Sequence, residues 1–505
     1  MELDERAGAI YASANGAPKP KISKNDNGPV IDLELNNLTK ANDTKWTIPM
    51  RQLPYVSIEY KVLFNKSDDK SSDFDRGEVK SAEDWETFFR KLKETYVRAF
   101  NSYMVGPAPA YWNDAKDFFE GKKELRKTPA DSLIKVLYNK MLQQAAATTE
   151  DISQLQSKVD NMSIFNFSIA LDRSDLPHEF LFVTPRYGPS KNNILIGGNS
   201  LEPILHLTGD KDIWISLGRT TFFSNRVPFW LEGENAEGFS VKNGWKDASY
   251  RLPVSKASDN VILENMDISL PASNMQILQV NRKTTLTGNY IESTMIDLET
   301  MDGYRDALSA TMKKDYSNKK KDNAPVADET QKPSESQKKE FKSEIESWFN
   351  QEPKELSSYK IDGLTADAFA YSSTFTMDNW VKKAGNNYIV EAGRFIGDAS
   401  KLDEAERKRT LDIHLQFART IQYNYSIAVP AGFTSKGIEN FNKNIKNDVG
   451  EFTSTATVSG DKVNFVIKRV LNKNYQPVAN WSKMMELTDA IFDFTQQKLL
   501  LEKNK

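Results

Sequence analysis

The sequence predicts an α+β protein, and two patterns support this class. Between residues 81 and 176, apolar side chains recur at three- and four-residue spacing, which is typical of amphipathic helices. From Glu179 onward, apolar residues come in short runs bounded by turn residues, which is typical of strands. Helices followed by a small antiparallel sheet make an α+β core.

The first 80 residues have strand character. Residues 1–35 are rich in Gly, Pro, Asn and Lys, and we expect a mobile or loosely strand-forming start there. Trp46–Pro49 and Tyr55–Phe64 alternate in the manner of strands, and a polar loop follows them.

Four helices are expected next. Ser81 can cap the first, which has acidic residues in its first turn and an apolar face extending to Phe100. The others are expected near 110–119, from Thr128 onward, and over roughly 152–176.

Strands are expected in the rest of the chain. The core sheet should include 180–183, 204–207 and 213–217, with a turn at 208–211. Beyond Val261 the predicted strands include 277–280, 284–286 and 290–295, and they return from 375 onward. The polar stretch 313–342 predicts a flexible insertion, and 480–497 predicts a terminal helix.

Composition excludes several classes of function. The chain has 505 residues, of which 39% are hydrophobic, so it can bury several cores. With 67 basic and 70 acidic residues the net charge is −3, which offers nothing to attract nucleic acid. No apolar run approaches the ~20 residues of a transmembrane helix, and the first residues do not resemble a signal peptide.

Cysteine is absent, which excludes disulfides and thiolate metal sites. The histidines His178, His206 and His414 lie far apart in the sequence and form no HxxxH pair, so we expect no metal and no cofactor.

Three passages together resemble a bacterial family. They are Trp46–Pro49 with Trp85, then Trp214–Thr220 followed by Val227-Pro228, and finally Tyr425–Phe433 with Gly450–Phe452. Their order resembles an exported family, common in Bacteroidetes, in which a transglutaminase-like, papain-type core lies between two β-sandwich domains of unknown function. Members with intact motifs are described as cysteine proteases.

The resemblance implies three domains. These are a shortened N-terminal β-sandwich region at 1–80, the transglutaminase-like core at 81–255, and a C-terminal β-sandwich region at 256–505. It also implies a periplasmic or secreted protein, although the chain itself shows no signal peptide.

The catalytic triad that the resemblance implies is missing. An active member carries Cys at the start of a buried helix, His on a strand, and Asp on the next strand. Here those positions fall near Met162, Leu201 and Ser216. With all three roles lost, we expect a non-catalytic scaffold, although residual enzymatic activity stays open.

Two residual hydrolases remain as alternatives. In one, Ser163 is the nucleophile, His206 is the base, and Asp210 or Asp212 is the orienting group. The alternative interpretation of the same residues is structural: Ser163 caps a helix, and His206 is half-exposed on a strand. The other uses a pair of carboxylates. Its candidates are Glu202, Asp210, Asp212, Glu232 and Glu234.

Binding is the third possibility. Phe222, Phe223, Phe229 and Trp230 cluster near Arg219 and Arg226 in the sequence. Aromatic side chains beside an inactive cleft could hold a peptide or a sugar ring, whereas packing against a neighbouring domain would need no ligand. The expected partner is a peptide, a glycan or an envelope protein.

Overall fold

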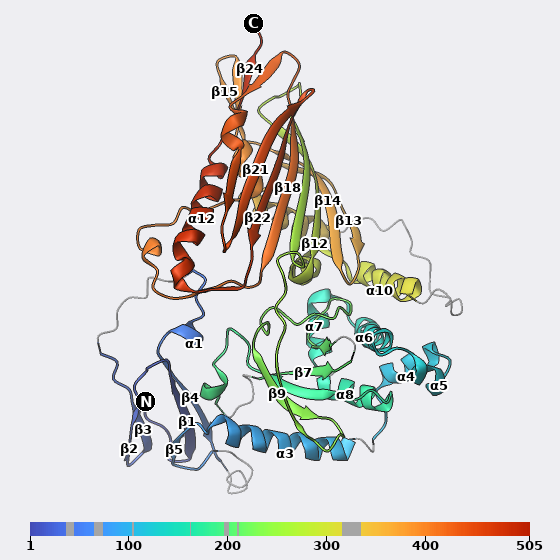
Figure 1. Cartoon of the computed structure of the whole chain (residues 1–505), viewed down its shortest axis with the longest axis vertical. Coiled ribbons are helices and arrows are strands. Elements are labelled where there is room, and N and C mark those ends of the chain that lie inside the picture. Colours follow the sequence, from blue (N-terminus) through green and yellow to red (C-terminus); the bar gives the residue numbers. More distant parts are fainter. Residues whose placement is uncertain are drawn as a thin grey trace. The chain divides into compact units, whose positions relative to one another are not determined.

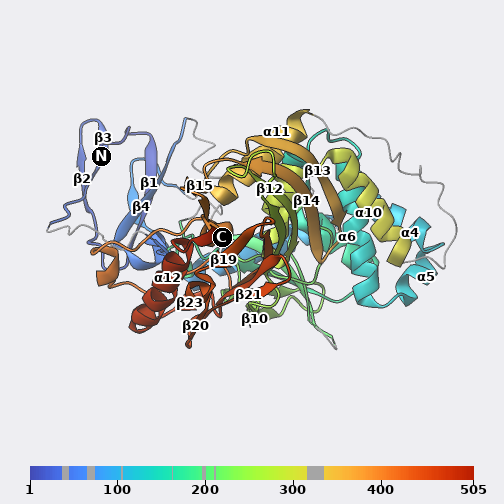
Figure 2. The same cartoon turned by 90° about the horizontal axis from the view of Figure 1, so that it is seen from above.

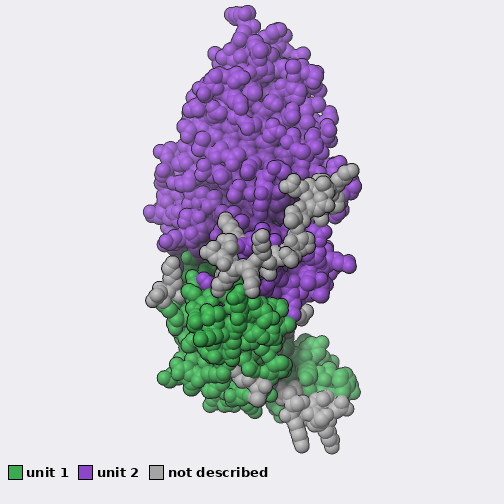
Figure 3. Space-filling model, turned by 90° about the vertical axis from the view of Figure 1, so that its right-hand side faces the viewer, with its two compact units in different colours: residues 1–131, 162–217, 225–254 green, residues 132–161, 218–224, 255–505 purple. Residues whose placement is uncertain are grey.

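The computed structural model describes residues 1–36, 45–64, 74–103, 106–161, 163–195, 201–209, 212–315 and 335–505. It is an α+β structure with several β-sheets, as the sequence predicts (Figure 1). The chain divides into two compact units, coloured separately in Figure 3. Unit 1 comprises residues 1–131, 162–217 and 225–254, and unit 2 comprises 132–161, 218–224 and 255–505. Because these units interleave along the chain, they do not test the three-domain division, which stays a prediction.

Unit 1 begins with a small sheet. Strand β1 (Ala7–Ala14) lies between β4 (Tyr55–Val62) and β5 (Val79–Ser81), and β2 (Lys21–Asn25) pairs with β3 (Gly28–Asp32). The expected strand over 55–64 is therefore confirmed. The expected strand at 46–49 is wrong, because the helix α1 (Pro49–Gln52) begins there with proline at its first position.

The helices of unit 1 follow the apolar spacing. They are α3 (Trp85–Tyr103), α4 (Ala110–Phe118), α5 (Lys122–Lys127) and α8 (Ile164–Arg173). Asp84, not Ser81, accepts the bond from the Thr87 amide at the start of α3. Helices α6 (Ala130–Ala146) and α7 (Ile152–Asn161) belong largely to unit 2, so the single helix expected over 152–176 is two helices.

A five-stranded sheet completes unit 1. Its strand order is β10 (Asp247–Arg251), β9 (Asn235–Ser240), β6 (Glu179–Val183), β7 (Glu202–Leu207) and β8 (Ile213–Ile215). Neighbouring strands are antiparallel throughout.

Unit 2 is built on an eight-stranded sheet. In spatial order the strands are β13 (Glu355–Leu364), β14 (Ala368–Met377), β12 (Leu278–Thr287), β11 (Val261–Ser269), β18 (Arg419–Ala428), β22 (Lys462–Leu471), β21 (Gly450–Ser459) and β20 (Lys443–Lys446). Only the β11–β18 pair is parallel among these described strands.

Smaller elements accompany this sheet. Helices α9 (Ile291–Leu298), α10 (Met301–Asp315), α11 (Glu335–Phe349) and α12 (Trp481–Thr495) belong to unit 2. Strands β15 (Val381–Ala384), β16 (Asn387–Val390), β24 (Leu499–Lys503) and β19 (Phe433–Lys436) form a second sheet, and β17 (Ile413–His414) pairs with β23 (Tyr475–Gln476). Short 3-10 helices occupy Lys191–Asn193, Gly288–Tyr290, Ala392–Ile396, Glu406–Lys408, Ile438–Phe441 and Val478–Asn480.

Helices α11 and α12 cover the same face of the eight-stranded sheet toward its two edges. Figure 2 shows them beside different ends of the sheet. Phe349 of α11 contacts Phe375 of β14, and Phe494 of α12 contacts Phe452 of β21. The strand register places these two strand residues on one face. The predicted terminal helix is thus confirmed as α12.

The strand expected over 290–295 is wrong, because this segment is helix α9. Strand β12 ends at Thr287, and the next residue, Gly288, has a positive φ of 64° that few other residue types adopt. A Cβ at this position would lie 2.3 Å from the Asn260 side chain, which accepts a bond from the amide of Asn289. The turn therefore redirects the chain out of the sheet. The expected insertion at 313–342 lies partly outside the described residues, but its last residues form α11.

A buried ion pair joins α11 to two strands. Arg282 on β12 is 2% exposed and donates to both carboxylate oxygens of Glu264 on β11, at 2.8 and 2.9 Å. It also donates to both oxygens of Glu344 on α11, at 2.7 and 3.0 Å. Thr284 and Tyr371 add bonds to these carboxylates. Every charged group in this network is hydrogen-bonded to an oppositely charged partner. These bonds offset the free-energy cost of burying the charges.

We expect Arg282→Ala to destabilise unit 2 by about 3–5 kcal/mol, because it leaves the fully buried Glu264 carboxylate without its cation. Chemical denaturation followed by tryptophan fluorescence measures this loss. The neighbouring Lys283→Ala, at an exposed position of the same strand, is the matched control and should cost less than about 0.5 kcal/mol. Equal losses for the two variants would contradict a structural role for the network.

Candidate functional site

One face of the five-stranded sheet is filled with aromatic rings. Phe180 and Phe182 of β6 contact Tyr96 of α3, with ring centroids 5.2 and 5.0 Å apart. Phe100 of α3 lies 5.5 Å from Phe180 and 4.2 Å from Phe165, in the first turn of α8. The start of α8, where the resemblance would place a nucleophile, therefore packs against this apolar face.

His206 lies on the opposite face. Successive strand residues point to opposite faces, and the residue next to it, Leu205, pairs with Phe180 on the aromatic face. The His206 ring stacks on Trp214, with centroids 3.9 Å apart, and Trp214 belongs to the apolar cluster of that other face. His206 is 0% exposed, so the expectation of a half-exposed histidine is wrong.

Two carboxylates flank the His206 ring. Glu179 Oε2 lies 3.1 Å from Nδ1, and Asp212 Oδ1 lies 3.3 Å from Nε2. Neither contact has the geometry of a hydrogen bond. The Tyr250 ring closes the edge of the imidazole at 4.4 Å, and its hydroxyl donates to Glu179 at 3.4 Å. His206 is thus enclosed by the sheet and its neighbours.

Ser163 serves as the N-cap of α8. Its hydroxyl oxygen accepts a bond from the Phe165 amide at 3.2 Å, at a strained φ of 38°. Because Phe165 packs on the aromatic face, the sheet lies between Ser163 and His206. The repurposed triad is not assembled. Of its two candidates for the orienting group, Asp212 lies beside His206 and Asp210 lies outside the described residues.

The convergence of the three lost positions stays a prediction, because Met162 lies outside the described residues. Leu201 is half-buried just before β7. Ser216 follows β8, is 9% exposed, and donates to the Leu217 carbonyl at 3.2 Å.

A serine–histidine pair that sequence reasoning missed lies within α8 and the turn after it. Ser168 Oγ is 2.5 Å from His178 Nε2, and His178 Nδ1 is 2.8 Å from the Leu176 carbonyl oxygen. The carbonyl can only accept, so His178 carries its proton on Nδ1 and Ser168 donates to Nε2. Ser168 is 0% and His178 4% exposed, so the pair resembles a catalytic dyad but is closed to a substrate. Ser168 and His178 are ten residues apart, and this spacing is not a recognisable sequence motif.

Most of the expected aromatic binding cluster is structural. Phe222 is 1% exposed and contacts Tyr304, so it cannot stack on a ligand. Arg219 is 7% exposed and pairs with Glu292 at 3.3 Å. The Phe223 amide donates to Asn139 at 3.3 Å. These three residues belong to unit 2, whereas Trp230 belongs to unit 1 and packs on its apolar cluster.

The carboxylates of unit 1 that were candidates for a catalytic pair contact different residues. Glu234 pairs with Arg51 at 3.2 Å, and Glu202 accepts bonds from Trp230 and Tyr187. Glu232 is 3% exposed, and Asp212 lies beside His206.

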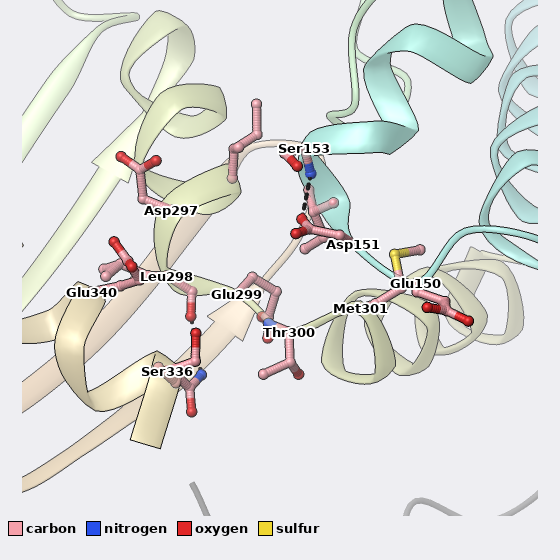
Figure 4. Close-up of a pocket in the computed structure, with 13 residues that line it drawn as sticks. Glu150, Asp151, Ser153, Asp297, Leu298, Glu299, Thr300, Met301, Ser336 and Glu340 are labelled. Atoms are coloured by element: carbon pink, nitrogen blue, oxygen red, sulfur yellow. Dashed lines mark hydrogen bonds between the residues drawn. The ribbon is translucent and has the colours of Figure 1, made fainter. Parts of the chain in front are cut away.

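A pocket of about 360 Å³ lies within unit 2 (Figure 4). It is bounded by the start of α7, the end of α9 and the beginnings of α10 and α11. Arg305 donates to the carbonyls of Ala146 and Thr149, and Thr149 directly precedes the lining residue Glu150. Gln337, which lines the pocket, donates to the Leu298 carbonyl at 3.0 Å. The described residues that line it include no Lys, Arg or His. Its acidic residues are Glu150, Asp151, Asp297, Glu299 and Glu340.

These carboxyl groups have unlike environments. Burial raises the pKa of Glu299 to about 7, although the Thr300 amide donates to it at 2.9 Å. Burial is the main cause that raises the pKa of Asp297, and the negative charge of Glu340 raises it further. Asp151 instead caps α7 by accepting from the Ser153 amide at 2.8 Å. Glu299 thus gains charge as the pH passes through neutrality.

Among the described residues, no group of three or more His, Asp or Glu side chains is placed to hold a metal ion. None of the helices within the described ranges has both the length and the apolar character that a membrane crossing requires.

Comparison with known proteins gives two matches. Residues 387–501 match a domain-of-unknown-function family with solved structures, DUF3858, which covers under a quarter of the chain. A crystal structure of a "putative protease" from Parabacteroides distasonis aligns with 99% of this chain and 74% of its own, at 12% identity and a TM-score of 0.44. No curated protein matches. The DUF3858 match fits the family that the sequence resembles, without establishing it for the whole chain.

His178 should make the protein sensitive to acid. Burial lowers its pKa from 6.5 to about 4, so between these values the unfolded chain binds a proton that the folded chain does not. Stability is then full above pH 6.5 and falls by about 3 kcal/mol as the pH drops to 4. Denaturation of unit 1 at several pH values measures how its free energy of unfolding depends on pH. His178→Gln should reduce this pH dependence, whereas the control His414→Gln should leave it unchanged. An unchanged pH dependence in His178→Gln would contradict the assignment to His178.

Proposed function

We propose that this chain is a non-catalytic, transglutaminase-like scaffold of the bacterial envelope that binds a ligand or partner. The observation that carries the proposal is the aromatic face between α8 and the five-stranded sheet. Phe180, Phe182, Phe100 and Phe165 fill the space beside the start of α8. His206 lies beyond the sheet, and the sequence supplies no thiol.

The alternative is a residual hydrolase. The buried pair Ser168–His178 is the arrangement that most favours it, because hydroxyl and base are already in contact. A substrate carbonyl would have to reach an oxygen on a fully buried side chain. The scaffold is therefore the better-supported function.

The pocket of unit 2 suggests the chemistry of the ligand. Its volume of about 360 Å³ lies within the range of small-molecule sites. Because the described residues that line the pocket include acidic side chains and no cation, the pocket favours an ammonium or guanidinium group. We propose that the pocket accepts a cationic group, such as a basic side chain of a peptide.

The purified chain should neither hydrolyse nor crosslink peptides above the uncatalysed rate. Fluorogenic peptide substrates and an amine-incorporation assay measure these activities. Turnover that persists in the wild type but is lost in Ser168→Ala or Ser163→Ala would establish the hydrolase instead. His414→Gln, away from both serines in the sequence, is the control for unspecific loss.

Hexalysine should bind, with an affinity that rises between pH 6 and pH 8 as Glu299 loses its proton. Glu299→Gln should remove most of this pH dependence and weaken binding about tenfold at pH 8, a loss of ~1.4 kcal/mol. Calorimetric titration measures both. The control Glu355→Gln, an exposed carboxylate on β13, should bind like the wild type. Binding that is equal in both variants and at both pH values would exclude the pocket.

A further inference from the structure

Strand β4 (Tyr55–Val62) is an open edge of the first sheet of unit 1. The strand order of this sheet is β4-β1-β5, so β4 pairs with β1 on one side, and no other described strand pairs with it. The strand is eight residues long. An edge strand of this length is a template for pairing with another chain, because the outer side of its backbone has no ladder partner.

The register of β1 shows which backbone groups of β4 face the open side. The amide of Ala9 and the carbonyl of Tyr11 form their bonds with the β5 segment, so both residues point away from β4. Ala9 lies opposite Tyr60, and Tyr11 lies opposite Ile58. Opposite residues of an antiparallel ladder either both face each other or both face away. Tyr60 and Ile58 therefore direct their N–H and C=O groups toward the open side.

The side chains along this edge are apolar. Val56 and Val62 alternate with Ile58 and Tyr60 and share their direction, because the strand repeats every two residues. Ile58 and Val62 pack against the apolar cluster of the sheet. Tyr60 is 57% exposed, and Phe64, two residues beyond the strand, is 70% exposed, the largest value among the large apolar side chains of the described residues. Outward backbone groups and exposed rings thus lie along one edge.

We propose that β4 pairs with β4 of a second copy of this chain, antiparallel about a twofold axis at Tyr60. In this register Tyr60 lies opposite Tyr60 of the second copy, Ile58 opposite Val62, and Val56 opposite Phe64. The first two kinds of pair join residues whose backbone groups face outward, so each pair exchanges two N–H···O bonds. The contact buries the exposed rings and joins two small sheets into one continuous sheet, with the same surface used on both copies.

Neighbouring registers are less favourable. An axis at Glu59 or at Lys61 would place that charge directly opposite the same charge of the second copy, which destabilises a strand pair. Moving the axis from Tyr60 two residues toward the N-terminus would set Pro54, which has no N–H to donate, opposite Val62. With the axis at Tyr60, Lys61 instead lies opposite Glu59, so opposite charges meet. The sequence of β4 is thus complementary to itself in the proposed register.

Sedimentation of the full chain over a range of concentrations tests the pairing. The mass should rise from that of one chain toward twice that value as the concentration increases. Tyr60→Lys sets two like charges opposite each other at the axis, and it should raise the dissociation constant of the dimer about tenfold or more. The control Tyr103→Lys, which replaces a 58% exposed tyrosine on α3, should dimerise like the wild type.

A charge reversal tests the register. Lys61→Glu sets like charges opposite each other across the contact, so it should weaken dimerisation. The double variant Glu59→Lys/Lys61→Glu should restore it, because opposite charges meet again. With an axis at Glu59 or at Lys61, like charges would still meet in the double variant and no recovery would occur.

Three outcomes would overturn the inference. One is the mass of a single chain at every concentration. Another is a dimer whose dissociation constant is the same in the wild type, in Tyr60→Lys and in Lys61→Glu, while all three unfold at the same temperature. The third is a loss of dimerisation in Lys61→Glu that the double variant does not reverse, which would exclude the proposed register.

Discussion

The two-residue alternation of strand β7 is the constraint that separates His206 from the start of α8. Leu205 and His206 are neighbours in sequence, and the pleat sends them to opposite faces of the sheet. A shift of one residue would exchange them and aim an imidazole at the start of α8. The shift is opposed from both sides, because Leu205 belongs to the buried face that packs on α3 and α8, and His206 stacks on Trp214.

Each unit contains a buried charged or titratable group whose hydrogen bonds have well-defined partners. In unit 2, Arg282 donates to both Glu264 and Glu344, and Thr284 and Tyr371 add further bonds to these carboxylates. In unit 1, burial lowers the pKa of His178, and both of its ring nitrogens are hydrogen-bonded. These groups contribute to stability and specify the packing, but they are closed to a ligand.

Groups that can meet a ligand lie elsewhere. The acidic pocket is lined by three separated stretches of the chain, and its Glu299 titrates near neutral pH. Binding in this pocket would need no nucleophile.

The sequence by itself determined the features that depend on local periodicity. The α+β class, the terminal helix and strand β4 follow from apolar spacing, which is set by 3.6 residues per helical turn and two per strand repeat. The cap at Ser163 is equally local. Where a short apolar segment fits both periods, as at 290–295, the turn at Gly288 decided for a helix.

Tertiary structure decided everything that needs a partner far along the chain. The face of the sheet that α8 covers, and hence the isolation of His206 from Ser163, depends on how α3 and α8 pack. Phe222 and Arg219 became buried because Tyr304 and Glu292, more than seventy residues later, lie against them. The bonds of Glu202 to Tyr187 and Trp230 likewise join three separate segments, and no spacing in the sequence encodes such contacts.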